Sequence, residues 1–201
     1  MRLYHSPASP FVRKVMVLLH ELDKVSEVEL ATVTTTALAS DQGLTAANPL
    51  ARLPSLERPG AVTLYDSRVI TAYLDDLFQG GLYPDTAARW DILTLEATGD
   101  GIMDSAVSMV YEVRLRPEDD QSADWIEAQW AKVERALGVL EERWLGHLSG
   151  AVTMGHISVA SALSYLDFRH DARDWRAGHQ ALAKWHAEFE SRPSMAATRP
   201  D

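Results

Sequence analysis

The sequence predicts a two-part protein, an α/β domain followed by an all-helical domain. Short strand-like and helix-like segments alternate over the first 80 residues, and long segments of helical periodicity fill the rest. All six tryptophans lie in the second part, whereas five of the nine prolines lie in the first 59 residues. A stretch punctuated by glycine and proline, residues 79–85, separates the two parts as a linker would. We therefore expect an α/β domain over residues 1–80 and an all-helical domain over residues 86–201.

The first part has the predicted order strand, helix, strand, helix, strand, strand, helix. In the second strand, Val28 and Leu30 alternate with glutamates, which predicts that these two apolar side chains face inward. Pro59-Gly60 is a strong turn signal and predicts a hairpin between the last two strands. The expected elements are strands at 2–5, 27–33, 53–57 and 62–65, helices from Pro10 and over 69–77, and an irregular or weakly helical stretch at 37–47.

The second part contains four segments of helical period, at 87–115, 122–148, 154–171 and 179–190. Two tryptophan pairs at helical spacing, Trp125/Trp130 and Trp175/Trp185, are predicted to lie in the core. Gly99 and Gly101 weaken the first of these helices, since glycine is a poor helix former. We expect them where another helix approaches closely, at a dimer contact or near the cleft.

Composition excludes several classes of function. The 201 residues include no cysteine, which removes disulfides, thiolate metal sites and cysteine nucleophiles. A formal charge of −10 argues against binding to nucleic acid or to anionic membrane surfaces. The apolar runs are too short to span a bilayer and no secretory signal is visible, so we expect a cytoplasmic protein. The seven histidines lack the spacing of metal ligands, so no metal is expected.

Ser9 precedes Pro10 at the expected start of a helix, a pattern typical of an N-cap. Capping alone accounts for this serine. A hydroxyl that accepts from a helix amide can also donate its proton to a ligand thiolate. Lowering a thiol pKa by about two units requires about 2.7 kcal/mol, and one hydrogen bond to a charged group supplies about 1.5–3 kcal/mol. The sequence leaves both roles open.

Two further points offer polar groups at the ends of expected elements. Pro54 enters a strand from a loop, so the bond after Leu53 is a candidate cis peptide that would leave the Leu53 backbone free for an extended ligand. The alternative is an ordinary trans proline. Ser67 could bind a carboxylate at a helix N-terminus while Asp66 binds an ammonium group. The alternative there is a plain helix cap.

Several segments carry a resemblance to a known family, and they are residues 6–15, 48–56, 64–70, 83–84, 165–169 and 191–194. Together they resemble the glutathione transferase superfamily, and bacterial serine-type members most of all. The resemblance covers nearly the whole chain and implies a thioredoxin-like first domain. It also implies that Ser9 activates the sulfur of glutathione, which is a co-substrate.

The resemblance assigns binding roles as well. Leu53 before a cis-Pro54 would pair with the cysteinyl unit, Asp66 and Ser67 would hold the γ-glutamyl end, and Arg52 would help to bind glutathione. A small apolar electrophile is expected between the domains, near Met103, Val107 and Tyr111. The activity implied is conjugation in detoxification by a homodimer. The alternative is a non-catalytic ligand carrier or protein-interaction module of the same fold.

One helix start departs from the family pattern. Members usually have a capping box of Ser or Thr followed by Asp three residues later, whereas this chain has Thr153 followed by His156. A neutral histidine can accept a hydrogen bond from the Thr153 amide, but less well than a carboxylate does. We therefore expect lower stability at this position than with aspartate.

Overall fold

A computed structural model describes residues 1–200, which form two compact units. Residues 1–86 and the segment from Pro193 onward form the first unit, and Ala87–Arg192 form the second. The first unit contains a mixed sheet with helices and the second is helical, so the predicted fold class is confirmed. The expected boundaries, 1–80 and 86–201, differ from this division because the C-terminal segment packs with the first unit.

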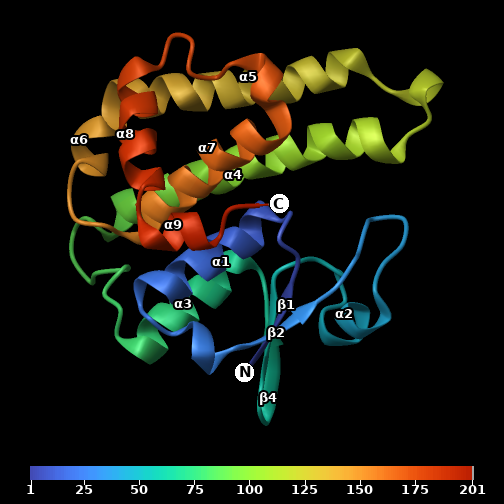
Figure 1. The fold of residues 1–201 in the computed structure, drawn as a ribbon, viewed down its shortest axis with the longest axis vertical. Coiled ribbons are helices and arrows are strands. Elements are labelled where there is room, and N and C mark those ends of the chain that lie inside the picture. The colour runs from blue at the N-terminus through green and yellow to red at the C-terminus, as the bar shows by residue number, and fades with distance from the viewer. Residues whose placement is uncertain (201) are drawn as a thin grey trace. The chain divides into compact units, whose positions relative to one another are not determined.

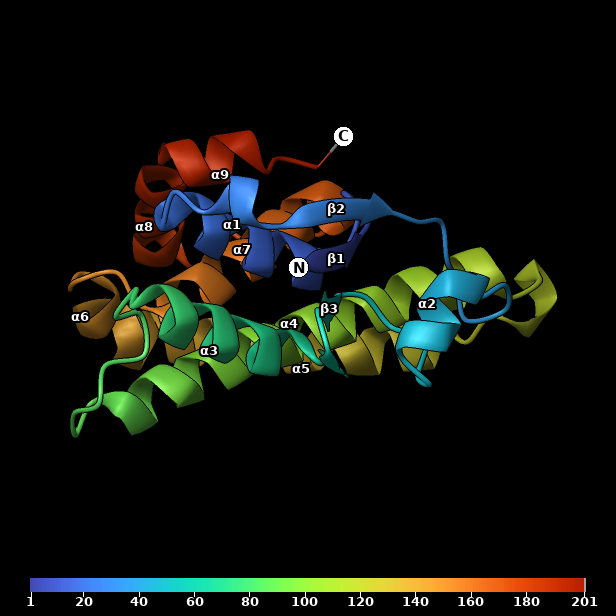
Figure 2. The same cartoon turned by 90° about the horizontal axis from the view of Figure 1, so that it is seen from below.

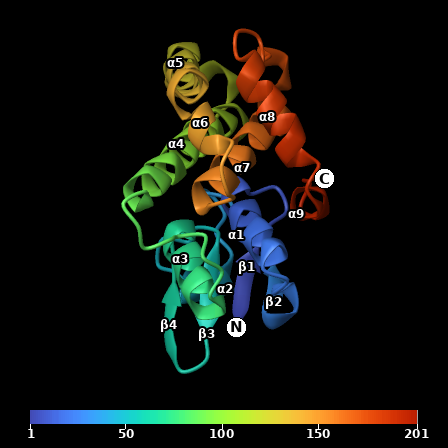
Figure 3. The ribbon, with the colours of Figure 1, turned by 90° about the vertical axis from the view of Figure 1, so that its left-hand side faces the viewer.

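Within residues 1–200, the first unit is built on a four-stranded sheet in the order β2-β1-β3-β4. Strand β1 is parallel to β2 and antiparallel to β3, which is antiparallel to β4. Helices α1 and α3 lie together on one side of the sheet, and α2 lies on the other (Figures 1 and 3). The elements are β1 (Arg2–His5), α1 (Pro10–Glu21), η1 (Val25–Glu27), β2 (Glu29–Thr32), α2 (Gln42–Ala47), β3 (Ser55–Arg58), β4 (Ala61–Leu64), α3 (Ser67–Phe78) and α9 (Pro193–Ala197).

The side of the sheet covered by α2 has a small core of its own. Tyr4, Ala31 and Leu44 are buried there together. Val28 is buried as predicted, but Leu30 is 40% exposed, so the inward orientation predicted for it is wrong. The reason is that β2 is an edge strand, and Ala31 rather than Leu30 is the residue that contacts this core.

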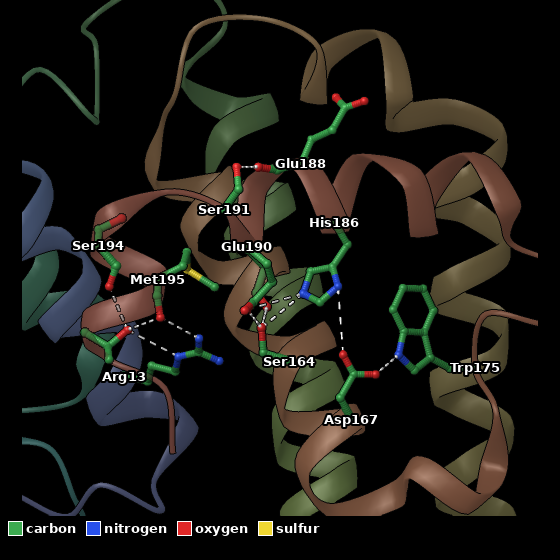
Figure 4. Close-up of polar contacts among 12 residues, drawn as sticks. Arg13, Ser164, Asp167, Trp175, His186, Glu188, Glu190, Ser191, Ser194 and Met195 are labelled. Atoms are coloured by element: carbon green, nitrogen blue, oxygen red, sulfur yellow. Dashed lines mark hydrogen bonds and ion pairs between the residues drawn. The ribbon is translucent and has the colours of Figure 1, made fainter. Parts of the chain in front are cut away.

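The C-terminal segment is held against α1 by polar contacts (Figure 4). The guanidinium of Arg13, which is only 5% exposed, donates to the Met195 carbonyl at 3.1 Å and to the Thr198 hydroxyl at 3.3 Å. The Ser194 hydroxyl donates to Glu21 near the end of α1. Helix α9 was not predicted, because five residues are too few to show helical periodicity.

The second unit is a set of helices in which α4 packs against both α5 and α7. Figure 2 shows α4 and α5 running alongside each other. The helix predicted over 122–148 is interrupted by a π-helical segment, η3. The elements are α4 (Arg89–Leu115), η2 (Glu118–Asp120), α5 (Ala123–Val139), η3 (Leu140–Trp144), α6 (Leu145–Leu148), α7 (Met154–His170), η4 (Asp171–Arg173) and α8 (Gln180–Glu190).

The tryptophans of this unit differ in burial. Trp130 and Trp175 are 8% and 2% exposed, so their predicted place in the core is confirmed. Trp125 is 48% exposed, and its core prediction is wrong. Its indole nitrogen donates to the Ser108 hydroxyl on α4 at 3.3 Å, in an exposed contact. Trp185 is half-buried.

Two glycines allow α4 and α7 to cross at close range. A Cβ atom on Gly99 would lie 2.7 Å from the backbone carbonyl carbon of Ser158, and one on Gly155 would lie 2.8 Å from Cβ of Leu95. A Cβ on Gly101 would meet nothing within 4 Å among the described residues. The close approach expected at Gly99 is therefore confirmed. No other helix of the described chain approaches Gly101, so a dimer contact at that residue stays a prediction.

We predict opposite effects for alanine at the two α4 glycines. Gly99→Ala should lower the free energy of unfolding by about 1–3 kcal/mol, because the backbone of α7 would have to move. Gly101→Ala, the matched control, should raise it by about 0.5–1 kcal/mol through helix propensity. Denaturant titration of both variants measures these changes. Shifts of the same sign would contradict the packing role of Gly99.

The capping box at the start of α7 forms with histidine in the third position. The Thr153 amide donates to Nδ1 of His156 at 3.2 Å, as expected. Burial of the imidazole, with the nearby charge of His147, lowers the pKa of His156 to about 4. The ring is therefore neutral at pH 7. Since Nδ1 accepts, its proton lies on Nε2.

The low pKa of His156 predicts a specific dependence of stability on pH. Between the unfolded pKa of about 6.5 and the folded value, the unfolded chain binds the proton and the folded chain does not. Stability is therefore lost as the pH falls through this window. From pH 7 to pH 5, the unfolding free energy of the wild type should fall by about 2 kcal/mol more than that of His156→Asn, which cannot titrate.

Denaturation curves at the two pH values measure this difference. Equal pH dependence in both proteins would contradict it. At pH 7, His156→Asp should also raise the melting temperature, because a carboxylate is the better acceptor beside a helix N-terminus.

Candidate functional site

The strand register brings three polar loops to one edge of the sheet. Tyr4, near the end of β1, pairs with Ser55 at the start of the antiparallel β3. The loop after β1 therefore lies beside the loop before β3. Leu56 of β3 pairs with Leu64, the last residue of β4, so the segment after β4 reaches the same edge. These loops hold the predicted site residues Ser9, Arg52, Leu53, Pro54, Asp66 and Ser67.

Ser9 caps the N-terminus of α1. Its backbone is extended (φ −87°, ψ 120°), and its hydroxyl oxygen accepts from the Val12 amide at 3.4 Å. The residue is half-buried, and the first turn of α1 contains no acidic side chain. The predicted cap is thus confirmed, and the positive end of the helix dipole is not neutralised locally. Within residues 1–200, the Ser9 hydroxyl hydrogen has no acceptor, so it is available to a ligand.

The Leu53–Pro54 bond is cis, which confirms the cis candidate. Over the described part of the chain, neither the amide nor the carbonyl of Leu53 has a hydrogen-bond partner. The exposed guanidinium of Arg52 also has no ion-pair partner in that part. An extended ligand can therefore pair with the Leu53 backbone as an added strand would.

Asn48 holds this loop in place, although the sequence analysis gave it no role. The residue is fully buried, and its Nδ2 donates to the Arg52 carbonyl at 3.1 Å and to the Ser55 hydroxyl at 2.9 Å. Its Oδ1 accepts from the Leu50 amide at 2.9 Å. The available sequence signal is an asparagine directly before a proline, between a helix and a strand. Asn48 is a positioning residue for the backbone next to Pro54.

Asp66 is the N-cap of α3, as expected from the alternative that this position is a plain helix cap. One carboxylate oxygen accepts from the Arg68 amide at 3.0 Å, and the other lies 3.2 Å from the Arg68 guanidinium. Burial tends to raise the pKa of Asp66, but the hydrogen bonds and charge of Arg68, with the charge of Lys14, together hold it below its usual value. The carboxylate is therefore ionised and can attract an ammonium group. The Tyr65–Asp66 bond is also cis.

Ser67 is the first residue of α3 and is 3% exposed. Its hydroxyl has no hydrogen-bond partner among residues 1–200, and the oxygen still has some accessible surface. The hydroxyl and the free amides of the first turn form a small anion-binding group at the positive end of the helix. The arrangement is compatible with the carboxylate site that the sequence predicts.

The three residues predicted near the electrophile all lie on α4 of the helical unit. Met103 is buried, Val107 is half-buried and Tyr111 is 41% exposed. Tyr111 lies in the electrostatic neighbourhood of Tyr165, whose pKa is raised mainly by burial despite the nearby charge of Arg169. The role of all three residues in binding stays a prediction.

A second constellation joins α7 to α8 in the helical unit (Figure 4). The Ser164 hydroxyl lies 3.0 Å from Nε2 of His186, and Nδ1 of His186 lies 3.9 Å from Asp167. The resemblance to a nucleophilic triad is superficial, because Ser164 is 6% exposed and its single hydroxyl hydrogen has two other acceptors within reach, the Ala160 carbonyl and the Glu190 carboxylate. The group is a buried polar network that links two helices.

The candidate site consists of hydroxyl, carboxylate, guanidinium and backbone groups. Across residues 1–200, no three histidine, aspartate or glutamate side chains are grouped so that they could hold a metal ion. None of the helices in the described chain is both long enough and apolar enough to cross a membrane.

The fold and the site together define a class of protein, in which a thioredoxin-like unit with a cis-proline edge is joined to a helical unit. Family models agree with this assignment. Residues 3–81 match the glutathione S-transferase N-terminal domain, and residues 123–188 match the C-terminal domain. The chain belongs to the glutathione S-transferase family.

Several relatives are similar over their whole length. A glutathione transferase family member from Pseudomonas fluorescens Pf-5, solved with bound glutathione, is 46% identical with a TM-score of 0.97, covering 100% of this chain and 98% of that one. A glutathione S-transferase from Methylobacillus flagellatus KT, also with glutathione bound, is 33% identical with a TM-score of 0.84, covering 100% and 99%. The uncharacterized GST-like protein YibF of Escherichia coli K12 is 33% identical over 208 residues, covering 100% and 98%.

Proposed function

We propose that this protein is a glutathione transferase that adds the thiolate of glutathione to a small, mostly apolar electrophile. The observation that carries the proposal is the Ser9 hydroxyl, which caps α1 and keeps its hydrogen available at the sheet edge that also holds cis-Pro54 and the start of α3. Glutathione bound to relatives that are 46% and 33% identical supports the same ligand here.

In the proposed binding mode, each polar group at this edge of the sheet contacts a different part of glutathione. The Leu53 backbone pairs with the cysteinyl unit of glutathione, because its amide and carbonyl have no partner in the described chain. The Ser67 hydroxyl and amide hold the γ-glutamyl carboxylate, and the ionised Asp66 attracts the ammonium group beside it. Arg52 adds a positive charge near the peptide. This mode places the thiol toward Ser9.

Ser9 then acts on the sulfur. Its hydroxyl accepts from the Val12 amide and donates to the thiolate, which the N-terminal end of the α1 dipole also favours. These two effects supply about 2–4 kcal/mol, enough to lower the thiol pKa by about two units from its ordinary value near 8.5. The thiolate attacks the electrophilic carbon, a carbon–sulfur bond forms, and the leaving group departs with its electron pair.

The electrophile is proposed to bind near Met103, Val107 and Tyr111 of α4. Ser9 favours ionisation of the sulfur, and the rest of the protein holds the two reactants close together. The homodimer and the role in detoxification stay predictions that follow from the family resemblance. The cytoplasmic location stays a prediction from the apolar runs and the N-terminal residues.

The central test removes the Ser9 hydroxyl. With a generic aryl halide at pH 7, Ser9→Ala should lower kcat/KM by about 10- to 100-fold, the loss expected from one to two units of thiol pKa. Retention on immobilised glutathione should persist, because the other contacts remain. Ser6→Ala, in the same loop, is the matched control and should behave as the wild type does.

Unchanged turnover in Ser9→Ala would contradict the role of Ser9. Wild-type protein that is retained on glutathione but turns over no electrophile in a broad panel would favour the carrier alternative. Failure of the wild type to be retained would favour a protein-interaction module.

A second prediction concerns Asp66. Asp66→Asn keeps a good N-cap but removes the negative charge that would attract the ammonium group. The KM for glutathione should rise about tenfold with little change in kcat, the value expected for one charge-assisted hydrogen bond. A glutathione analogue that lacks the amino group provides the control, because wild type and variant should bind it equally. An equal loss with both peptides would assign Asp66 a structural role only.

A further inference from the structure

In the helical unit, the last turns of α7 lie beside the C-terminal part of α4. The two helices pack against each other, and Gly99 and Gly155 let their backbones approach closely. Further along, Nε2 of His170 in the last turn of α7 lies 3.0 Å from the Ala106 carbonyl of α4. Side chains near the ends of both helices are therefore brought to the same region.

Two tyrosines and two arginines gather in this region. Tyr111 and Arg114 belong to the last two turns of α4, and Tyr165 and Arg169 belong to the last two turns of α7. The pKa of Tyr165 is raised mainly by burial, and the guanidinium of Arg169 opposes this through its charge and a hydrogen bond. Tyr111 raises the same pKa further and the charge of Arg114 lowers it. The two side chains from α4 therefore also lie close to the Tyr165 hydroxyl.

The two arginines of this cluster differ from their neighbour Arg116 in having no carboxylate partner. Arg116 pairs with Glu112 at 3.0 Å. Neither Arg114 nor Arg169 forms an ion pair with any of residues 1–200. Carboxylates are nevertheless abundant in this part of the chain, because residues 81–201 carry 20 acidic and 12 basic side chains. The positive charge of the cluster is therefore left for a ligand to neutralise.

The arginines and one tyrosine of the cluster can be reached from solvent. Arg114 and Tyr111 are exposed, and Arg169 is half-buried. The guanidinium carbon of Arg169 lies 3.7 Å from the ring centroid of Phe168, a contact that holds the group in place. Nε of Arg169 is buried without a partner, so a ligand would contact the terminal nitrogens. A guanidinium presents these nitrogens in a geometry that matches a carboxylate.

The cluster continues the surface of α4 on which the electrophile is proposed to bind. Met103, Val107, Tyr111 and Arg114 follow one another at spacings of four, four and three residues, which places them on one face of the helix. We infer that Arg114 and Arg169 are specificity-determining residues that bind a carboxylate on the electrophile. The preferred second substrate is then an apolar electrophile that carries one carboxylate group. This inference rests on the proposed transferase function.

An aryl chloride with a carboxylate, 4-chloro-3-nitrobenzoate, is a suitable probe, and 4-chloro-3-nitrobenzamide is its uncharged counterpart. With either compound, the thiolate of glutathione attacks the ring carbon that bears chlorine. A carbon–sulfur bond forms, the carbon–chlorine bond breaks, and chloride leaves with the bonding electron pair. The two products differ only in the group that Arg114 and Arg169 are proposed to recognise.

Calorimetric binding of the two products tests the inference without turnover. Wild-type protein should bind S-(4-carboxy-2-nitrophenyl)glutathione at least about threefold more tightly than S-(4-carbamoyl-2-nitrophenyl)glutathione. Arg114→Gln and Arg169→Gln should each reduce this preference, and the double variant should abolish it. Arg116→Gln, an ion-paired position at the same helix end, is the matched control and should keep it. The ratio of kcat/KM for the two chlorides should change in the same way.

Equal affinity of the wild type for the two products would overturn the inference, as would a preference that survives in the double variant. Weaker binding of both products at an unchanged ratio would also overturn it, because the arginines would then have a structural role only. Binding of neither product would contradict the proposed function and this inference together. A binding preference without turnover of either chloride would count against the proposed transferase activity alone, so the two proposals fail separately.

Discussion

The first turn of α1 has amide groups that no carbonyl of the helix can satisfy, and the proposed activity depends on how this constraint is met. Pro10 has no amide hydrogen, and the Ser9 hydroxyl accepts from the Val12 amide. This arrangement fixes the oxygen at the positive end of the helix and leaves its own hydrogen for another acceptor. The side chain that completes the helix is therefore already oriented to stabilise an anion.

The strand register brings the capped start of α1 close to the other groups of the candidate site. Because β3 runs antiparallel to both β1 and β4, the loop after β1, the loop before β3 and the segment after β4 meet at one edge. Asn48 then fixes the backbone next to Pro54 from a fully buried position. These three short segments, which come from different parts of the chain, therefore lie next to one another, and no long structured loop is needed to bring them together.

The sequence was informative wherever a local signal determines the structure. Serine before proline identified the α1 cap, Pro59-Gly60 identified the hairpin, and Asp66 proved to be the cap that the simpler reading expected. These features depend on a few neighbouring residues and on the hydrogen bonds of a helix start or turn.

The features that the sequence did not predict depend on tertiary contacts. The exposure of Leu30 follows from the position of β2 at the edge of the sheet, and the exposure of Trp125 follows from the face of α5 on which it lies. Helix α9 is defined by its contacts with Arg13 and Glu21, which lie about 180 residues earlier in the chain. The role of Asn48 likewise becomes visible only when its three partners are known.

At position 156, histidine stands where the common capping pattern has aspartate, and this difference affects more than the end of the helix. Nδ1 takes over the acceptor function that a carboxylate usually has, and burial of the ring lowers its pKa to about 4. One imidazole ring thus determines both the helix cap and its dependence on pH.

The most direct measurement is a titration of the thiol in the protein–glutathione complex, followed by the ultraviolet absorbance of the thiolate. The account predicts an apparent pKa about two units below the free value of about 8.5, with most of the shift lost when Ser9 is replaced by alanine. A bound thiol that titrates near its free value, or a depressed value that survives the replacement, would contradict the central role of the Ser9 hydroxyl.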